Sequence, residues 1–224
     1  PDGIVLENNN PSLQRSNSLK RIALSYDESL KALNSANDND FIMLSDNDEI
    51  PNLDALQFKN NKKDIVLFNQ LFFYYKFNLL YDKMVWPGTK GCIKKKLQSL
   101  SWLRNIKLKK YPFWRLDTLF SHTKYIDINI IKDGGWHFTN IKTPEDMYEK
   151  FMNFGHHDEF KLSGLTVDKI EDKIKKRELF YNHFADSSSQ NKWESDYKLK
   201  KIEMNNLPKY LINNKEKYKE WFEI

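Results

Sequence analysis

Residues 41–56 read FIMLSDNDEIPNLDAL, so four mostly apolar residues run directly into three acids and a proline. The first four residues, FIML, have the character of a buried β-strand. In an open α/β sheet, ligands bind in the crevice outside the carboxyl ends of the strands. Acids placed directly after a buried strand therefore stand where a phosphate-bearing ligand and its metal would bind. This order of strand and acids favours an α/β fold with a site at Asp46 and Asp48.

Asp46 and Asp48 are separated by one residue, and side chains along extended backbone alternate with a period of two. The two carboxylates can therefore face the same side, and hard oxygen ligands suit Mg²⁺ or Mn²⁺. The alternative is an acidic, solvated turn between a strand and a helix, because turns are rich in Asp and Asn. A calcium-binding EF-hand loop is excluded, because Pro51 occupies its sixth position, where glycine is needed for a sharp turn.

Helical and strand patterns alternate along the chain. Residues 16–33 carry apolar side chains at the three-and-four spacing of an amphipathic helix. Thr143 and Pro144 form a helix start, which predicts a helix to about residue 154. A further helix is expected over 166–181, and strands are expected at 41–44, 64–68, 71–77 and 125–131. The 71–77 run also fits a buried helix. The alternation is typical of α/β proteins.

Length and composition indicate one soluble globular domain. The 224 residues are 40% hydrophobic and 14% aromatic, which is enough to close a sizeable core. We expect residues 1–184 to form this domain and residues 185–224 to form a polar linker and a helical tail that packs on it. The opening PDGIVLENNN looks like the middle of a domain, so a further portion is expected upstream. No apolar run approaches the roughly 18 to 20 residues that cross a bilayer.

The charge balance leaves a second class of function open. The chain has 36 basic and 31 acidic residues and a net charge of +5, which favours anionic partners without identifying them. Runs such as Lys94–Lys96, together with a lysine-rich aromatic tail, fit a nucleic-acid or polyanion binding module. Lysine is abundant throughout, however, and basic runs are usually solvated faces. We therefore expect no nucleic-acid partner.

Six blocks of sequence occur in an order that points to one enzyme family. They are SDNDEIP at 45–51, VWPGTKG at 85–91, YPFWR at 111–115, DGGWHF at 133–138, HHDEF at 156–160 and LPKYLINN at 207–214. Together with QRSNSLKRIAL at 14–24, they resemble glycosyltransferase family 17, which includes the β-1,4-mannosyl-glycoprotein β-1,4-N-acetylglucosaminyltransferases. No single block is decisive, but the ordered set covers nearly the whole chain.

The resemblance implies a GT-A-like nucleotide-sugar fold, in which helices flank a Rossmann-like mixed sheet. It also implies a divalent metal, Mn²⁺ or Mg²⁺, and inversion at the anomeric carbon. UDP-N-acetylglucosamine would be the donor and a glycan or glycoconjugate the acceptor. A first nucleotide-binding strand would then lie upstream of residue 1. The asparagine- and lysine-rich composition favours a cytoplasmic microbial or viral enzyme.

Sugar transfer from a nucleotide needs positive charge near the leaving diphosphate. A metal held by carboxylates supplies it as a Lewis acid. Asp48 is the expected metal ligand, and Asp46 either binds the metal through water or holds the ribose. Lys90 and Arg115 would neutralise the remaining phosphate charge, although both also fit ordinary surface charges. Glu49 points the other way by strand alternation, so we expect it to pair with a buried arginine.

Inversion by direct displacement also needs a base for the acceptor hydroxyl. Asp133 and Glu159 are the candidates. Asp133 precedes two glycines that permit a sugar to approach the backbone, whereas Glu159 lies on a helix beside two histidines. Each also fits a capping or surface acid, and the sequence does not rank them.

Histidine and tryptophan side chains complete the expected site. His157 matches the histidine of the family's His-x-Glu-Phe pattern and is the expected metal ligand, whereas the adjacent His156 points about 100° away on a helix. His137 either ligates the metal, hydrogen-bonds a sugar or is a satisfied core residue. Trp86 and Trp136 can stack on the apolar face of a sugar ring, although aromatic residues beside glycine also fill cores.

Overall fold

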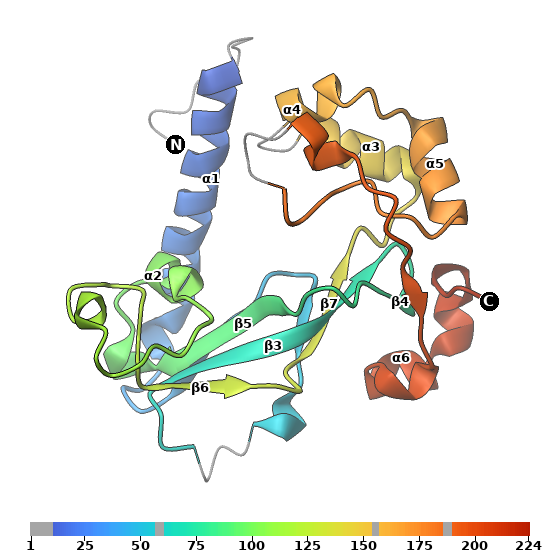
Figure 1. Cartoon of the computed structure of the whole chain (residues 1–224). Coiled ribbons are helices and arrows are strands. Elements are labelled where there is room, and N and C mark those ends of the chain that lie inside the picture. Colours follow the sequence, from blue (N-terminus) through green and yellow to red (C-terminus); the bar gives the residue numbers. More distant parts are fainter. Residues whose placement is uncertain (1–10, 57–60, 154–156, 186–189) are drawn as a thin grey trace. The chain divides into compact units, whose positions relative to one another are not determined.

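The computed structural model of the chain describes residues 11–56, 61–153, 157–185 and 190–224 (Figure 1). These residues form two compact units. The sheet unit comprises the described residues within 23–72 and 83–137, and the helical unit comprises those within 1–22, 73–82 and 138–224. Helix α1, Pro11–Lys31, contributes to both units, as do strand β3, Ile65–Tyr74, and strand β7, Gly135–Thr139.

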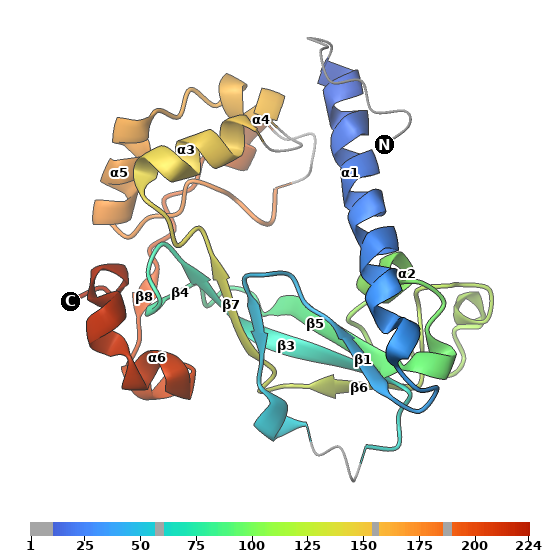
Figure 2. The ribbon, with the colours of Figure 1, turned by 180° about the vertical axis from the view of Figure 1, so that it is seen from behind.

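Four strands form the main ladder of the sheet unit (Figures 1 and 2). Strand β1, Phe41–Leu44, pairs antiparallel with β5, Trp86–Ile93, and β5 pairs antiparallel with β3. Strand β6, Ile128–Ile131, pairs parallel with β3. The sheet is therefore mixed, and Leu44, the last residue of the FIML strand, pairs with Lys90. This register sets the acids that follow β1 beside β5.

Strand β3 is buried on both faces. Ile65 and Leu67 pack with Trp102 and Leu103 of helix α2, Leu100–Asn105. The alternate residues Val66 and Phe68 pack with Leu56 on the opposite face. Covered faces explain why the strand reads as a near-continuous hydrophobic run instead of alternating polar and apolar residues.

A second, short ladder of the sheet unit joins β2, Glu49–Pro51, to β7. Glu49 pairs with His137, Ile50 with Trp136, and Pro51 with Gly135, all antiparallel. The ladder begins one residue after Asp48. It therefore fixes the far end of the acidic turn, whereas β1 fixes the near end.

The helical unit holds most of the remaining helices. They are α3, Pro144–Met152, α4, His157–Leu162, α5, Val167–Lys175, and α6, Lys209–Asn213, and the unit also holds the short paired strands β4, Leu79–Leu80, and β8, Lys200–Lys201. Two threonines act as N-caps. Thr143 accepts a hydrogen bond from the Asp146 N–H at 3.2 Å, and Thr166 accepts one from the Lys169 N–H at 3.4 Å. Both helix starts follow from local sequence.

Aromatic side chains dominate the core of the helical unit. Phe151, Phe160 and Phe180 surround Trp193, with ring centroids 5.2–6.2 Å from that indole. Large aromatic side chains bury much apolar area in few residues, which suits a unit built from short helices. The clustered rings include Phe160, the last residue of the HHDEF block.

The expected elements are confirmed in kind and corrected in extent. The α/β class, the FIML strand and the helices expected from 144 and 166 are present. The helix expected over 16–33 spans Pro11–Lys31, and the strand expected at 125–131 begins only at Ile128. A single strand, β3, joins the 64–68 run to residues 71–74, so the helical alternative for 71–77 is wrong, and residues 75–77 lie in the turn that follows. The helix expected to reach residue 181 ends at Lys175, and residues 190–224 belong to the helical unit together with residues 138–185. None of the helices in the described part of the chain has the length and apolar character that crossing a bilayer requires.

Gly134 lies in the turn between β6 and β7, and Gly135 begins β7, where the chain passes close to two neighbouring segments. A Cβ on Gly134 would lie 2.5 Å from the carbonyl oxygen of Asn69, and one on Gly135 would lie 2.1 Å from that of Ile50. Gly135 also has a φ of +115°, which side chains other than glycine rarely adopt. The protein's own backbone thus makes a close approach at both glycines, and the approach of a sugar to this turn stays a prediction.

We expect Gly135→Ala to lower the free energy of unfolding by about 2–4 kcal/mol, because the new carbon meets fixed backbone at a disfavoured φ. Gly164→Ala is the control, since Gly164 has a φ of +64° but open space around its Cβ. That change should cost only about 1 kcal/mol. Urea unfolding followed by tryptophan fluorescence measures both. Equal losses would mean that the β2–β7 ladder accommodates the extra carbon.

Candidate functional site

The acidic turn after β1 is held by one permanent cation. Arg104, on helix α2, donates from Nη1 to Asp46 Oδ1 at 2.6 Å. The turn is closed by a backbone hydrogen bond in which the Glu49 N–H donates to the Asp46 carbonyl at 3.0 Å. The Asp46 side chain stays about one-third exposed, at 34%. Asp46 is therefore fixed in direction while remaining accessible from outside.

A hydroxyl and amide chain ties the start of the turn to the sheet. Ser45 Oγ lies 2.6 Å from Thr89 Oγ1, and Gln70 Nε2 donates to the same Thr89 oxygen at 3.2 Å. Thr89 and Gln70 are fully buried. Gly88 leaves room for this arrangement, because a Cβ at that position would lie 1.9 Å from Gln70 Oε1 and the amide would have to move. The residue before Asp46 is thus anchored in the core by hydrogen bonds.

The other side of the turn rests on a stacked pair of rings. Trp86 and His137 lie parallel, with ring centroids 4.2 Å apart and an interplanar angle of 7°. Trp86 Nε1 donates to Glu49 Oε1 at 2.8 Å, and Glu49 Oε2 accepts from the Asp46 N–H at 3.2 Å. His137 Nδ1 lies 3.6 Å from Asp48 Oδ1. Both aspartates are therefore connected to the same buried network.

Burial controls the protonation of two groups in this network. It raises the pKa of Glu49, an effect opposed by the hydrogen bonds from Trp86 and from the Asp46 backbone. Burial also lowers the pKa of Lys90 to about 8, helped by the positive charge of Arg104. Lys90 Nζ donates to the carbonyl oxygen of Ile106 at 2.7 Å and also to that of Arg104, so it satisfies the end of helix α2.

A cavity of about 210 Å³ opens beside the turn. Glu49, Trp86, Lys90 and Arg104 line it, together with Leu44, Pro87, Gly88 and Asn105. Its walls combine one indole ring with charged groups of both signs. Such a lining suits a polar ligand that carries negative charge and also presents an apolar face.

The donor set at the turn fits a hard divalent cation. Asp46 and Asp48 supply carboxylate oxygens, and their side chains are 34% and 32% exposed. Mg²⁺ in particular is often held by one or two carboxylates together with substrate phosphates and water. No group of three His, Cys, Asp or Glu side chains that could hold a metal occurs among the described residues.

Several predicted site residues thus come together in the sheet unit: Asp46, Asp48, Trp86, Lys90 and His137. Trp86 and His137 stack on each other, and the His137 ring is buried. Trp136 lies on the neighbouring position of β7, half-buried and paired with Ile50. Whether these rings meet a sugar stays a prediction, whereas their structural role in holding the turn is visible.

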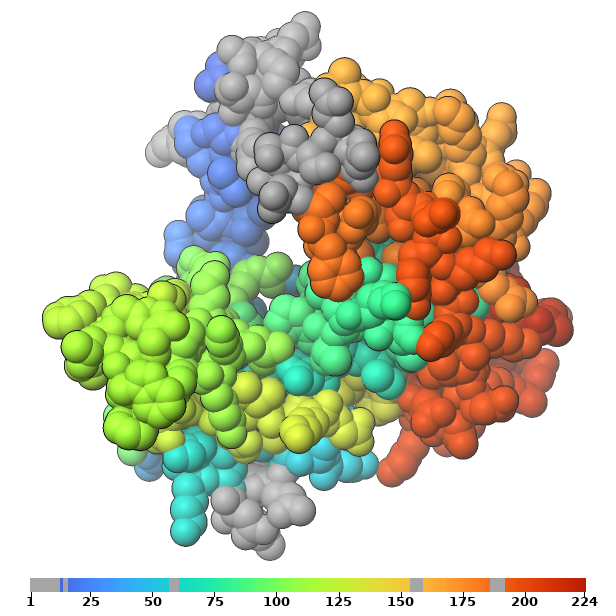
Figure 3. Space-filling view, in the orientation of Figure 1, coloured from blue at the N-terminus to red at the C-terminus, as the bar shows by residue number. Residues whose placement is uncertain are grey.

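Arg115 lies elsewhere in the sheet unit, on the surface loop of residues 107–124, which is yellow-green in Figure 3. It donates to both carboxylate oxygens of Asp117, at 2.6 and 2.8 Å, and Lys124 binds the same carboxylate at 2.8 Å. These cations hold the pKa of Asp117 well below its usual range. Within the structure Arg115 organises its own loop, and its role toward a phosphate stays a prediction.

Asp133 lies in the sheet unit at the turn between β6 and β7. Its side chain is exposed, and Asn52 Nδ2 donates to it at a distance of 3.3 Å. The turn itself is fixed, since the Gly134 N–H donates to the Asn69 carbonyl at 2.8 Å. Asp133 is thus an accessible carboxylate on rigid backbone.

Glu159 and His157 lie in the helical unit, on α4. Glu159 accepts a hydrogen bond from the buried Lys192 at 2.7 Å and forms an ion pair with it. The side chain of His157 lies outside the described residues, as does all of His156, so the expected metal role of His157 stays a prediction.

Sequence reasoning missed the residues that hold the turn. Arg104 carries no motif and becomes a partner of Asp46 only through the packing of α2 on the sheet. Tyr26 of α1 is half-buried, and burial raises its pKa. The positive charge of Arg104 opposes this rise, whereas the negative charges of Asp46 and Glu49 add to it. The expected arginine partner for Glu49 is replaced by the indole of Trp86. Among Arg104, Tyr26 and Trp86, only Trp86 could be proposed as a site residue from the sequence, because it belongs to the VWPGTKG block.

The lysine run Lys94–Lys96 binds its own chain. Lys94 donates to the Ala36 carbonyl, Lys95 donates to Asn39 Oδ1 at 3.1 Å, and Lys96 lies 3.6 Å from Asp64. These contacts give the run an intramolecular role. They weaken the alternative of a polyanion-binding module.

Replacing Lys90 with methionine should change how stability depends on pH. The pKa of Lys90 is about 8 in the folded chain against 10.5 for an ordinary lysine. The folded state therefore binds fewer protons between these values, and stability rises with pH across that window. Lys90→Met should flatten the rise, whereas Lys109→Met, at an exposed position, should preserve it. Urea unfolding at about pH 7 and about pH 10 measures the difference. An unchanged slope in Lys90→Met would show that other groups cause the rise.

The whole chain matches one family model. The match is to Glycosyltransferase family 17 and covers residues 6–222, nearly the full length. No curated protein and no solved structure matches the chain. The family match agrees with the six ordered sequence blocks, and the acidic turn in one of them forms the centre of the network described above. The chain therefore belongs to glycosyltransferase family 17.

Proposed function

We propose that this glycosyltransferase transfers N-acetylglucosamine from UDP-N-acetylglucosamine to a glycan acceptor, with inversion at the anomeric carbon. The proposal includes a GT-A-like fold and Mn²⁺ or Mg²⁺ at the acidic turn. Family membership supports sugar transfer, which requires a sugar donor and an acceptor. One observation carries the rest: two aspartates at the end of strand β1 are fixed by Arg104 and by the Glu49–Trp86–His137 network beside a cavity.

The turn is suited to the diphosphate of a nucleotide sugar. Asp48 and Asp46 would hold the metal, which when bound stabilises the charge on the leaving diphosphate. Arg104 lines the cavity, and its side chain is 43% exposed, so its guanidinium can contact a phosphate oxygen while it keeps Asp46 in place. Lys90 is less suited to this task, because its ammonium is already bound by two carbonyl groups.

The cavity beside the turn would receive only one part of the donor. Its volume of about 210 Å³ is below the roughly 300–1,000 Å³ that is usual for a whole ligand pocket. Trp86 and Glu49 both line the cavity, joined by a hydrogen bond. A sugar ring could place its apolar face on the indole, and the phosphates would then reach the aspartates at the rim.

Asp133 is the better candidate for the base. In an inverting displacement the acceptor oxygen bonds to the anomeric carbon, the bond from that carbon to the diphosphate oxygen breaks with its electron pair, and the hydroxyl proton passes to the base. Asp133 is exposed and accepts one long hydrogen bond, from Asn52. Glu159 is instead held in an ion pair with the buried Lys192 at 2.7 Å, so its carboxylate is already engaged.

Replacing Asp48 with alanine should abolish metal-dependent donor binding. We expect calorimetric titration of the full-length protein with UDP-N-acetylglucosamine to show binding that needs Mn²⁺ and that weakens at least about tenfold in Asp48→Ala. Asp64→Ala is the control, since Asp64 is a half-exposed acid of the same unit. Equal affinity of Asp48→Ala and the unmodified protein would remove the metal site from the acidic turn.

Replacing Asp133 with asparagine should affect turnover and spare donor binding. Asparagine keeps the shape of the side chain but cannot take up the proton, so we expect kcat to fall by about 10²–10⁴-fold. Glu159→Gln should lower kcat much less. Transfer to a glycan acceptor, with donor affinity measured separately, distinguishes the two. A larger loss in Glu159→Gln would assign the base to that residue.

A further inference from the structure

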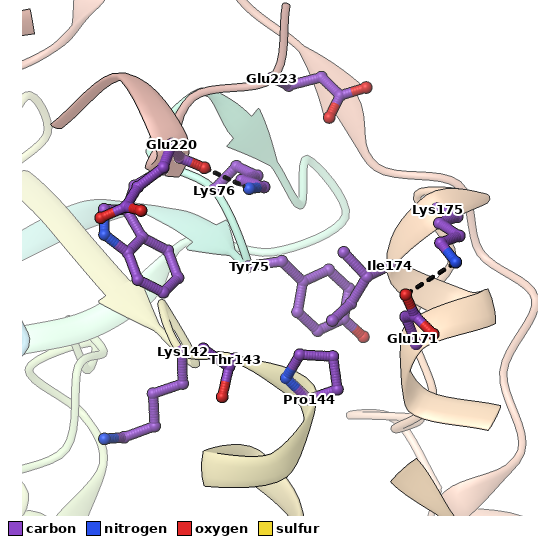
Figure 4. A pocket seen from close by; sticks show the side chains of 11 residues that line it. Tyr75, Lys76, Lys142, Thr143, Pro144, Glu171, Ile174, Lys175, Glu220 and Glu223 are labelled. Atoms are coloured by element: carbon purple, nitrogen blue, oxygen red, sulfur yellow. Dashed lines mark hydrogen bonds and ion pairs between the residues drawn. The ribbon is translucent and has the colours of Figure 1, made fainter. Parts of the chain in front are cut away.

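The helical unit contains a larger pocket that has no part in the site at the acidic turn. Its volume is about 440 Å³, within the range of small-molecule sites. Four segments line it: the turn after β3, the start of α3, the helix α5 and the C-terminal 3₁₀ helix Lys215–Trp221 with the residues that follow. Figure 4 shows Tyr75, Pro144 and Ile174 beside one another in its middle.

Unusual backbone conformations gather around this pocket. Among the described residues, three non-glycine residues have a positive φ: Tyr75 at 64°, Asn140 at 55° and Arg177 at 57°. Tyr75 lines the pocket, Asn140 lies two residues before the lining residue Lys142, and Arg177 lies two residues after the lining residue Lys175. For a bulky aromatic such as Tyr75 this conformation is an outlier. Strained residues of this kind tend to cluster at ligand sites.

The C-terminal wall of the pocket is held by hydrogen bonds from the segment that follows β3. Asn78 exchanges two hydrogen bonds of 2.8 Å with the backbone of Glu223, and the Phe77 N–H donates to the Trp221 carbonyl at 2.8 Å. Lys76 donates to the Glu220 carbonyl and lies 5.6 Å from the centroid of the Trp221 ring. The wall is therefore in place before any ligand arrives, which lowers the entropy cost of binding.

The charges that line the pocket balance one another. It has three lysines and three glutamates, and two of the glutamates are paired: Glu171 with Lys175 at 2.7 Å, and Glu223 with Arg177 at 2.6 Å. Glu220 and Lys142 show no ion pair within the described part of the chain. A ligand with large net charge would meet repulsion from one of the two signs, whereas a neutral ligand with hydroxyl groups could donate to Glu220 and accept from Lys142.

We propose that this pocket binds a neutral sugar ring of the glycan acceptor. The inference rests on the proposed transfer to a glycan. The apolar surfaces of Pro144, Ile174 and Trp221 would receive the C–H face of the ring. The ring hydroxyls would donate to the Glu220 carboxylate and accept from Lys142 and Thr143. A second sugar site in the helical unit would give the enzyme selectivity for acceptors that carry this sugar.

Saturation-transfer NMR on the full-length protein without donor tests the proposal. The probes are the methyl glycosides of mannose, galactose and N-acetylglucosamine. We expect transfer to at least one of them, strongest at the protons of one ring face. Glu220→Ala should weaken that binding about tenfold or more, because a hydrogen bond to a charged group is lost. Glu216→Ala, an exposed glutamate of the same 3₁₀ helix outside the pocket, should bind as the unmodified protein does.

Three results would overturn the proposal: no transfer to any of the glycosides, equal affinity in Glu220→Ala and the unmodified protein, or an equal loss in Glu216→Ala. Donor titration of the same Glu220→Ala protein separates this proposal from the proposed function. Intact metal-dependent donor binding without glycoside binding would reject only the acceptor pocket. Glycoside binding by a protein that fails to bind the donor would reject the donor assignment and leave the sugar pocket standing.

Discussion

The buried carboxylate of Glu49 is the group on which the acidic turn depends. One oxygen accepts from the Trp86 indole and the other from the Asp46 backbone. A buried carboxylate without these bonds would cost several kcal/mol or take up a proton. The same side chain belongs to the residue that pairs with His137 in the β2–β7 ladder. The turn, the indole and the strand pairing are therefore a single coupled structure, and a change in one moves the other two.

The two aspartates of the turn have different electrostatic partners. Asp46 faces a guanidinium, which stays charged at every relevant pH, whereas Asp48 lies near the imidazole of His137, whose charge depends on protonation. An arginine fixes one carboxylate in direction and charge. An imidazole leaves the second carboxylate open to a stronger cation. This difference agrees with the assignment of Asp48 as the principal ligand and of Asp46 as its support.

Local chemistry was enough to predict several features from the sequence. The FIML strand, the Thr143 cap and the acidic turn all depend on residues within a few positions of one another. The partners of the turn could not be found in this way. Arg104 reaches Asp46 across 58 positions, and Trp86 reaches Glu49 across 37, so both contacts exist only after the sheet and α2 have packed. The need for glycine at 134 and 135 also comes from distant segments, since the backbone that approaches them belongs to Asn69 and Ile50.

The division of the chain into two units has a consequence for its synthesis. The chain passes from one unit to the other inside helix α1, inside strand β3 and inside strand β7, so neither unit is one continuous segment. The sheet unit needs residues up to 137, whereas the helical unit needs the described residues within 1–22, the excursion at 73–82 and the part of the chain after 137. During translation the sheet unit can therefore close first, with the 73–82 segment waiting for partners that have not yet emerged from the ribosome. Apolar residues in that segment, including Phe73 and Leu79, are buried in the folded chain and would stay exposed for that interval, and transiently exposed apolar surface favours aggregation.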